Sequence, residues 1–325
     1  MKLQITKKVK ILYGALWIYR NVGNPNFKKL EESWTKSTVI GRYFYCLLLL
    51  LKKIMQLNPV KINEIDTSVL LYVNSNNTYR SLDFLRNRGV FFSQVSSVKH
   101  IENDKVEDVN LQYSYPILSL VQLPFAFLYY IYINPKFSLQ YPDFFVENWG
   151  KLEWNLKFLE QQSKLKIVVF SNDHNVQNRL FLSACKIKKI HTVYIQHAAV
   201  SKYFPPLDFD TSFLYGKIDS EKYKSIGGVC ENIVLTGIPS FDPYLKYRKI
   251  KNKINIVGVS FNILDNIKLI GKIADYLVNE LGYQVIIRPH SRDNRSLNII
   301  FDGISISDAK IENPYNYLKK IDMHI

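Results

Sequence analysis

Three of the six histidines come shortly after apolar runs that predict β-strands, and imidazole is the side chain best suited to move a proton near neutral pH. His174 follows the run Ile167–Phe170, His197 follows Thr192–Ile195, and His290 follows a third run of this kind. A single histidine in such a place is commonly a structural group. Because the carboxyl ends of parallel strands meet at the ligand-binding edge of an open α/β sheet, three of them favour a functional site. The pattern predicts acid–base chemistry there, with His197 as a general base on a hydroxyl group.

Other polar residues end the same strands and would line the same cleft. Asp173 or Asp210 could orient the imidazole of His197, if the fold brings either carboxylate close to it. Glycines that follow two further predicted strands let backbone approach a ligand closely, or merely permit the turn. The residues expected to line the cleft are Ser171, Asn172, Asp173, His174, Gln196, Gly216 and Gly237.

A basic segment, Arg288-Pro289-His290-Ser291-Arg292, follows a predicted strand near the C-terminus. Positive side chains near a helix N-terminus suit a phosphate or diphosphate group, because free backbone N–H groups act together with the side chains. A basic loop tip is the alternative interpretation. Ser260 and Asn262 close the first predicted strand of the same C-terminal region, and we expect them to face the same cleft. The residues expected to bind the phosphates of a donor are Arg288, His290, Ser291, Arg292, Ser260 and Asn262.

The sequence contains none of the motifs GxGxxG, Walker A, HExxH or a nucleophile elbow. Asp208 and Asp210 have the loose DxD spacing that can hold a metal, but one such match in a long chain is weak evidence. We therefore expect neither a metal nor a bound cofactor.

The strands that position these residues alternate with helical patterns, which is typical of βαβ units and a parallel sheet. A basic linker, Lys246–Lys253, precedes a new unit in which a helix over Asn266–Leu281 lies between strands Ile254–Val259 and Tyr283–Ile287. We therefore expect a first domain over residues 1–245 and a second over residues 246–325. The fold class is α/β, with two Rossmann-like domains facing across a cleft. The second has few strands for a doubly wound sheet and is expected to be incomplete.

Two apolar stretches lie in the first domain, whose first 60 residues are basic throughout. Tyr43–Leu51, flanked by Arg42 and Lys52, is too short for a bilayer span, which needs about 20 residues. It could lie in a membrane interface or form a buried helix. Val106–Val146 is rich in aromatic residues but contains prolines, which favours packed helices or a membrane-facing patch over a span. A further helix is expected over residues 148–162.

The 325 residues carry a net charge of +15. This excess of lysine and arginine favours an anionic partner, which could be nucleic acid, acidic lipid or a phosphorylated small molecule; a solubility surface is the alternative. The sequence has no known nucleic-acid-binding motif, so nucleic acid is not expected. Cys46, Cys185 and Cys230 have no metal or redox spacing, which indicates reduced thiols in a cytoplasmic protein.

The motifs follow one another in a fixed order along the chain. A predicted strand is followed by SNDH and a second by QH; then come YG, TGIPSFD, a linker and a strand followed by RPH. This order resembles the GT-B glycosyltransferases of bacterial surface-polysaccharide synthesis, a group that includes CDP-glycerol glycerophosphotransferases and polysialyltransferases. The resemblance covers roughly residues 167–292. It implies a GT-B-like fold, with His197 and His290 as catalytic residues and Arg288 beside the donor phosphates. The family's turn before the linker corresponds to Gly237, Pro239, Phe241 and Asp242.

The chain departs from the family pattern at Ala198, where glycine is usual, and at Ser291, where proline is usual. Family members continue with a Ser/Thr-rich segment and an acidic residue that bind the nucleotide, which implies that the second domain is truncated here.

The resemblance implies a metal-independent glycosyltransferase or polyol-phosphate transferase of capsule and cell-envelope synthesis. Its donor would be a nucleotide-sugar or a CDP-glycerol-like molecule, and its acceptor a hydroxyl group of a lipid-linked molecule or an oligosaccharide. The expected location is peripheral, at the inner face of the cytoplasmic membrane. The alternative is a truncated or degenerate, non-catalytic paralogue that binds the acceptor or partners of the pathway.

Overall fold

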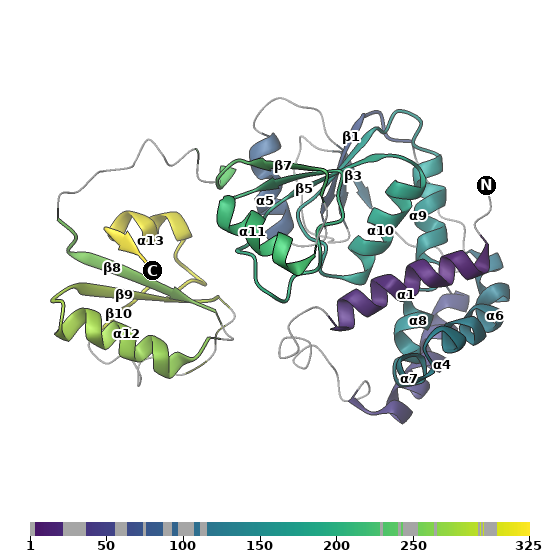
Figure 1. Cartoon of the computed structure of the whole chain (residues 1–325), viewed down its shortest axis with the longest axis horizontal. Coiled ribbons are helices and arrows are strands. Elements are labelled where there is room, and N and C mark those ends of the chain that lie inside the picture. The colour runs from purple at the N-terminus through teal and green to yellow at the C-terminus, as the bar shows by residue number, and fades with distance from the viewer. Residues whose placement is uncertain are drawn as a thin grey trace. The chain divides into compact units, whose positions relative to one another are not determined.

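The computed structural model describes residues 4–21, 37–55, 64–73, 76–86, 93–96, 107–110, 116–227, 230–239, 242, 253–262, 265–291, 293, 295 and 304–325. The chain forms two compact units, Met1–Pro243 and Tyr244–Ile325, each with a parallel sheet and helices (Figure 1). The division falls next to the boundary that the basic linker predicts between residues 245 and 246.

The first unit contains a sheet whose described strands lie in the order β3-β2-β1-β4-β5-β6-β7, and every neighbouring pair is parallel. The strands are β1 (Val69–Val73), β2 (Ser93–Ser96), β3 (Glu107–Asn110), β4 (Ile167–Phe170), β5 (His191–Ile195), β6 (Thr211–Leu214) and β7 (Asn232–Leu235). The parallel α/β class predicted from the sequence is confirmed. The strand order reverses between β1 and β4, and the carboxyl ends of two strands that diverge in this way usually border the ligand site.

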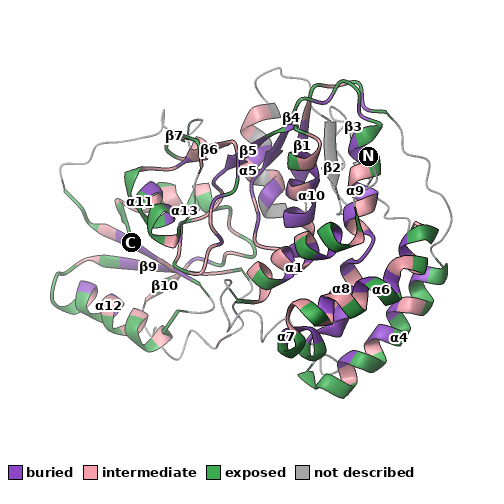
Figure 2. Ribbon diagram, turned by 45° about the vertical axis from the view of Figure 1, so that its right-hand side comes forward, coloured by how far each residue is buried: buried purple, intermediate pink, exposed green. Residues whose placement is uncertain are grey.

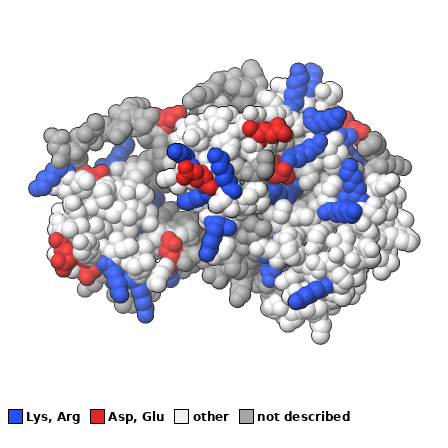
Figure 3. Space-filling view, viewed as in Figure 1, with Lys and Arg blue, Asp and Glu red and all other residues white. Residues whose placement is uncertain are grey.

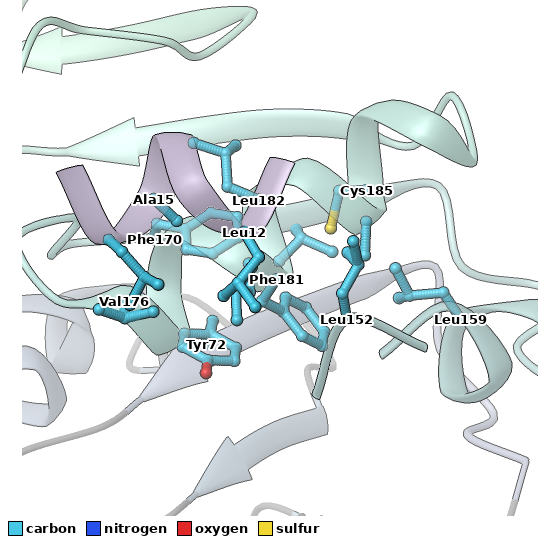
Figure 4. Packing of buried hydrophobic residues seen from close by; sticks show 14 of the residues in the cluster. Leu12, Ala15, Tyr72, Leu152, Leu159, Phe170, Val176, Phe181, Leu182 and Cys185 are labelled. Atoms are coloured by element: carbon cyan, nitrogen blue, oxygen red, sulfur yellow. The ribbon is translucent and has the colours of Figure 1, made fainter. Parts of the chain in front are cut away.

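Helices cover both faces of this sheet. Those that connect its strands are α5 (Asn76–Arg86), α10 (Val176–Ile187) and α11 (Lys217–Ile226). Alternate strand residues turn to opposite faces, so each face has its own apolar core. On one face Tyr72 of β1 stacks on Phe181 of α10 with ring centroids 4.5 Å apart (Figure 4). On the other face Leu71 packs with Leu82 of α5. The buried residues accordingly concentrate in the sheet and in α10 (Figure 2).

Further helices pack against α10 and against one another. They are α1 (Ile5–Asn21), α4 (Val39–Met55), α6 (Ile117–Ile133), α7 (Pro135–Gln140), α8 (Pro142–Asn148) and α9 (Lys151–Glu160). The packed helices predicted within residues 106–146 are confirmed from Ile117 onward. Glu107–Asn110 is instead strand β3, and the prediction was wrong there because the polar run EDVN lacks a strand pattern. Gly150, whose φ is 91°, separates α8 from α9 and shortens the helix expected over residues 148–162.

None of the helices in the described part of the chain is both long enough and apolar enough to cross a bilayer.

The second unit is a smaller parallel sheet, with its described strands in the order β10-β9-β8-β11. Its elements are β8 (Ile256–Phe261), α12 (Ile267–Asn279), β9 (Gln284–Pro289), β10 (Ser305–Ile306), α13 (Pro314–Lys320) and β11 (Met323–His324). The order reverses between β8 and β11, as it does between β1 and β4. A Cβ at Gly258 would collide with Tyr317 of α13 and with Ile321, so the glycine lets α13 pack closely on β8. The sequence predicted β8, α12 and β9 but missed β11, because two residues carry no periodicity.

Candidate functional site

The structure brings four of the predicted residues together at the carboxyl ends of β4 and β5. Ser171, Asp173 and His174 lie in the turn after β4, and His197 comes shortly after β5, which pairs with β4. The ring centroids of His174 and His197 are 5.8 Å apart. Since β4 borders the reversal of strand order, this histidine cluster lies where a doubly wound sheet usually binds its ligand.

Asparagine side chains fix the turn that carries this cluster. The Oδ1 of Asn172 accepts the backbone N–H of His174 at 2.8 Å, and the side-chain amide of Asn178 donates to the carbonyl of Asn172. The Oδ1 of Asn175 accepts the N–H of Asn178 at 2.8 Å and caps α10. Asn172, predicted to line the cleft, therefore holds the shape of the turn.

Asp173 is the carboxylate that stands beside the histidines, and it is buried together with Arg179 of α10. Arg179 donates to the Oδ2 of Asp173 at 2.7 Å, to its carbonyl at 2.9 Å and to the carbonyl of Pro206 at 3.1 Å. Burial raises the pKa of the Asp173 carboxyl, against the opposing charges of Arg179 and His197. Arg179 was not predicted, and its only signal in the sequence is an arginine on an otherwise apolar helix face.

Four polar atoms of the histidine cluster are buried and find no hydrogen-bond partner among the described residues. They are Ser171 Oγ, Asp173 Oδ1, His174 Nε2 and His197 Nδ1. Asp173 Oδ1 lies 3.5 Å from His174 Nε2, which is too far for a good hydrogen bond. Because a buried polar atom without a partner costs free energy, native proteins hold few of them. Their concentration in one place leaves several polar atoms that water or the polar groups of a ligand could satisfy.

Both histidines are neutral at pH 7. Burial lowers the pKa of His174 to about 4, and the charge of Arg179 acts in the same direction. Burial also lowers the pKa of His197 to about 4, helped by His174 and opposed by the charge of Asp173. A neutral imidazole has a nitrogen lone pair that can accept a proton, so the cluster can act as a base at neutral pH.

The loop between β5 and β6 closes over the histidine cluster. The ring of Phe204 packs edge-on against His174 at a centroid distance of 4.2 Å, and the carbonyl of Pro206 accepts from Arg179. Neither residue was predicted, although the run YFPP in the middle of the segment between β5 and β6 is unusual for a solvated loop.

Asp210, the second candidate for orienting His197, lies elsewhere, and this alternative was wrong. Its Oδ2 accepts the backbone N–H and the hydroxyl of Thr192, each at 2.7 Å, at the amino end of β5. His197 follows the carboxyl end of the same strand. Asp208 forms an ion pair with Lys186, so the two acidic residues of the loose DxD pair serve separate contacts. The described residues contain no group of side chains arranged to hold a metal ion.

The other residues predicted for this cleft shape the same edge of the sheet. Gln196 is buried; its Oε1 accepts the N–H of Tyr215 at 2.7 Å and its amide donates to the carbonyl of Ala198 at 2.9 Å, which ties β5 to β6. Gly216 begins α11 directly after β6, and Gly237, with a φ of 72°, follows β7. These three residues shape the backbone of the turns next to His197. Two of them are glycines, and the amide of Gln196 is used in the hydrogen bonds given above.

In the second unit, Arg288 is buried at the end of β9. Its terminal nitrogens donate to the Oγ of Ser307 and to the carbonyl of Glu312, both at 2.7 Å, and its guanidinium lies 5.1 Å from the centre of the Tyr317 ring. Each terminal nitrogen therefore makes one hydrogen bond within the unit, which uses two of the five N–H donors of the guanidinium. This guanidinium anchors the segments around β10 and α13 to β9.

The loop after β9 is held to the loop after β8. Asp293 receives the guanidinium of Arg295, which also donates to the carbonyls of Asp265 at 3.0 Å and Asn262 at 3.2 Å. The carbonyl of His290 accepts the N–H of Asp293 at 2.8 Å. Asp293 and Arg295 were not predicted as site residues. The expected phosphate ligand Ser291 is exposed in this loop, and Arg292 lies outside the described residues.

Ser260 and Asn262 lie at the carboxyl end of β8, beside the reversal of strand order. The Oγ of Ser260 is 2.9 Å from the Nε2 of His324 in β11 and 3.5 Å from the hydroxyl of Tyr317. The N–H of Asn262 donates to the Oδ2 of Asp265 at 2.6 Å. His324 was missed because the strand that carries it is too short to recognise.

No family model and no curated protein sequence matches the chain. Among solved structures it is similar to the crystal structure of MurG from Acinetobacter baumannii, at 12% sequence identity and a TM-score of 0.38, over 77% of this chain and 68% of that chain. The sequence identity and the TM-score are both too low to support an argument about activity. The fold therefore rests on the strand order and register given above, and the function on the side chains.

Proposed function

We propose that the chain is a GT-B-type transferase of the group that it resembles, which moves a glycosyl or polyol-phosphate group from a nucleotide-activated donor to a hydroxyl group of a surface-polysaccharide acceptor. The observation that carries the proposal is the set of buried, unpartnered polar atoms at the carboxyl ends of β4 and β5. An acceptor hydroxyl bound there would supply the missing hydrogen-bond partners. Both imidazoles are neutral at pH 7 and so have a lone pair for its proton, but a pKa of about 4 makes each a weak base, so the proposal requires the bound substrates to raise the pKa of His197.

His197 is the proposed general base. Its unpartnered Nδ1 would accept the hydroxyl proton while the acceptor oxygen forms a bond to the electrophilic carbon or phosphorus of the donor. The bond from that atom to the leaving oxygen of the nucleotide phosphate breaks, and the nucleotide departs with the electron pair. The charge of Asp173 already favours the protonated form of His197, so it would stabilise the imidazolium that forms. Ser171 Oγ is placed to hydrogen-bond the acceptor.

The donor is assigned to the second unit in this proposal. The loops after β8 and β9 carry Ser260, Asn262, His290 and Ser291, which supply hydroxyl, amide and imidazole groups for phosphate oxygens. Arg288 supports them by fixing β9 to the segment before α13, because its terminal nitrogens are engaged within the unit. The reaction as proposed uses no metal, since developing charge on the leaving phosphate would be met by the loops.

A non-catalytic protein that binds the acceptor or partners of the pathway is the second candidate. The observation that favours it is the engagement of Arg288, the guanidinium that the resemblance places at the donor phosphates. Such a protein would not bind nucleotide-activated donors. Nucleotide binding by calorimetry therefore separates the two candidates.

The test measures release of nucleotide by the full chain from CDP-glycerol, CMP-sugars and UDP-sugars, with an oligosaccharide acceptor and with EDTA present. His197→Ala should lower kcat/KM by about 100-fold or more, because a positioned general base contributes that much. His191→Ala is the matched control, since His191 sits at the other end of the same strand, where its Nε2 is 3.1 Å from the hydroxyl of Thr211. Full activity of His197→Ala would refute the assigned base. Failure of every donor to bind would favour the non-catalytic role.

A further inference from the structure

Helix α4 packs against the protein through its charged residues. The residues it buries are Arg42, Cys46, Leu49 and Lys53. Arg42 donates to both carboxylate oxygens of Asp143 in α8 at 3.1 Å, and Lys53 donates to the carbonyl of Glu147 at 3.1 Å. This is the reverse of an ordinary surface helix, which turns its apolar side inward and its charged side to water.

Apart from Lys52 near its end, the outward side of α4 is apolar. Ile40 is 84% exposed and Met55, at the other end, is 82% exposed. The exposed apolar residues of this helix are Val39, Ile40, Tyr43, Phe44, Leu47, Leu48, Leu51, Ile54 and Met55. Single exposed apolar residues are normal, but a contiguous group of this size marks a surface that binds another molecule.

Helix α6 adds a second apolar stripe. It has no charged residue, and its exposed members recur at helical spacing: Ile117, Leu118, Val121, Phe125, Leu128 and Tyr132. Both helices flank α8, because Cys46 and Leu49 of α4 pack with Val146 while Tyr130 of α6 stacks on Phe145. Figures 1 and 2 both place α4 and α6 in the same group of helices, and Figure 2 shows exposed residues along both. We call the exposed apolar residues of these two helices the α4–α6 surface.

The exposed charges on α4, α6 and the helices beside them are mostly positive; the exception is the half-buried Glu147 of α8, since Asp143 of the same helix is buried and paired with Arg42. Helices α1, α4, α6 and α7 contain no aspartate or glutamate. Their exposed charged side chains are Lys7, Lys10, Lys52 and Lys136. The corresponding part of the space-filling view is white with scattered blue (Figure 3). A second copy of this chain would bring the same positive charge to the contact, whereas an anionic lipid headgroup would complement it.

We infer that the α4–α6 surface lies in the interface of an anionic membrane. Its apolar side chains enter the boundary between headgroups and acyl chains, while the lysines reach the lipid phosphates. The paired Arg42 and Lys53 hold α4 against α8 with its apolar side outward. This inference goes beyond the proposed transfer reaction and rests on the helices alone, so it stands or falls separately from the role of His197.

The test is flotation of the full chain with vesicles of phosphatidylcholine containing phosphatidylglycerol. Leu47→Glu with Leu51→Glu, and separately Phe125→Glu with Leu128→Glu, should each weaken binding about tenfold or more, because each pair removes two inserted apolar side chains. Binding should also weaken in high salt and with vesicles of phosphatidylcholine alone. Ile218→Glu with Leu269→Glu is the matched control, since these residues are similarly exposed but lie on α11 and α12.

Two results would overturn the inference. One is vesicle binding that the α4 and α6 variants leave unchanged. The other is no vesicle binding by the natural chain, together with a dimer in sedimentation velocity that the same variants dissociate, which would identify a second copy as the occupant. Circular dichroism melting curves of all variants confirm that the substitutions, which lie on exposed positions, leave the fold intact.

Discussion

The half-buried histidines His174 and His197 should make the stability of the chain depend on pH between 7 and 5. His174 and His197 have pKa values near 4 in the folded chain, against about 6.5 when unfolded. Between these values the unfolded chain binds more protons than the folded one, so the free energy of unfolding falls as the pH falls. The stabilisation that depends on the two neutral histidines is complete above about pH 6.5 and is lost progressively as the pH falls towards 4.

The expected size follows from these pKa values. From pH 6.5 to pH 5, each such histidine loses up to about 2 kcal/mol, at 1.36 kcal/mol per pH unit. Summed over both histidines, the free energy of unfolding should fall by about 2 to 4 kcal/mol. The range extends below twice the single value because each ring shields the other from water, so the two shifts are not independent, and because the side chain of His174 is 31% exposed. Asp173 acts in the opposite sense, since burial raises its pKa and a protonated carboxyl is favoured in the folded chain as the pH falls.

The assay is urea unfolding at pH 7, 6 and 5, with NMR titration of the histidine rings. His197→Asn should remove about half of the loss in stability between pH 7 and 5. His191→Asn, at the exposed end of the same strand, should leave that loss unchanged. Ring pKa values near 6.5 for His174 and His197, or a free energy of unfolding that does not change with pH, would show that the cluster is open to water and would refute the reasoning.

Two further predictions concern packing. Arg179→Met should lower the free energy of unfolding by about 3 to 5 kcal/mol, because it leaves the Asp173 carboxylate buried without its partner; Asp173→Asn in the same chain should recover much of this loss in a urea titration. Gly258→Ala should cost about 1 to 3 kcal/mol, because the new methyl group meets Tyr317 and Ile321. Gly14→Ala in α1, where nothing lies within 4 Å, is its control and should be neutral or stabilising. Equal effects at the two glycines would contradict the packing explanation.

The sequence was sufficient to place the histidine cluster, because both signals are local. A β-branched run predicts a strand, and the polar residue after it must lie at the carboxyl edge, so His174 and His197 meet once β4 and β5 pair. Asp210 was misplaced because it precedes strand β6, which puts it at the amino edge beside Thr192. Asp210 lies far from His197 because the strands run parallel, and this direction has to be considered before an acidic residue is assigned to a histidine.

Contacts made by side chains distant in sequence could not be predicted. The RPH segment predicted a phosphate-binding arginine, which stays a prediction, but it did not predict that Arg288 also donates to Ser307 and Glu312, which come 19 and 24 residues later in the sequence. The pairing of Asp173 with Arg179 likewise depends on the turn that Asn172 and Asn175 shape. In each case the residue types were informative, and their partners were fixed only by the fold.

The side of α4 that faces the protein could likewise not be predicted from the sequence. The continuous apolar run Tyr43–Leu51 leaves two interpretations open, a segment in a membrane interface and a buried helix. The inward side is set by Asp143 and by the carbonyl of Glu147, which give Arg42 and Lys53 partners inside the protein. Arg42 is paired with the Asp143 carboxylate, whereas burial lowers the pKa of Lys53 to about 7, so its amine is partly neutral where it meets the carbonyl of Glu147. Burying these two side chains leaves the leucines of α4 in water, and the proposed membrane contact would cover them.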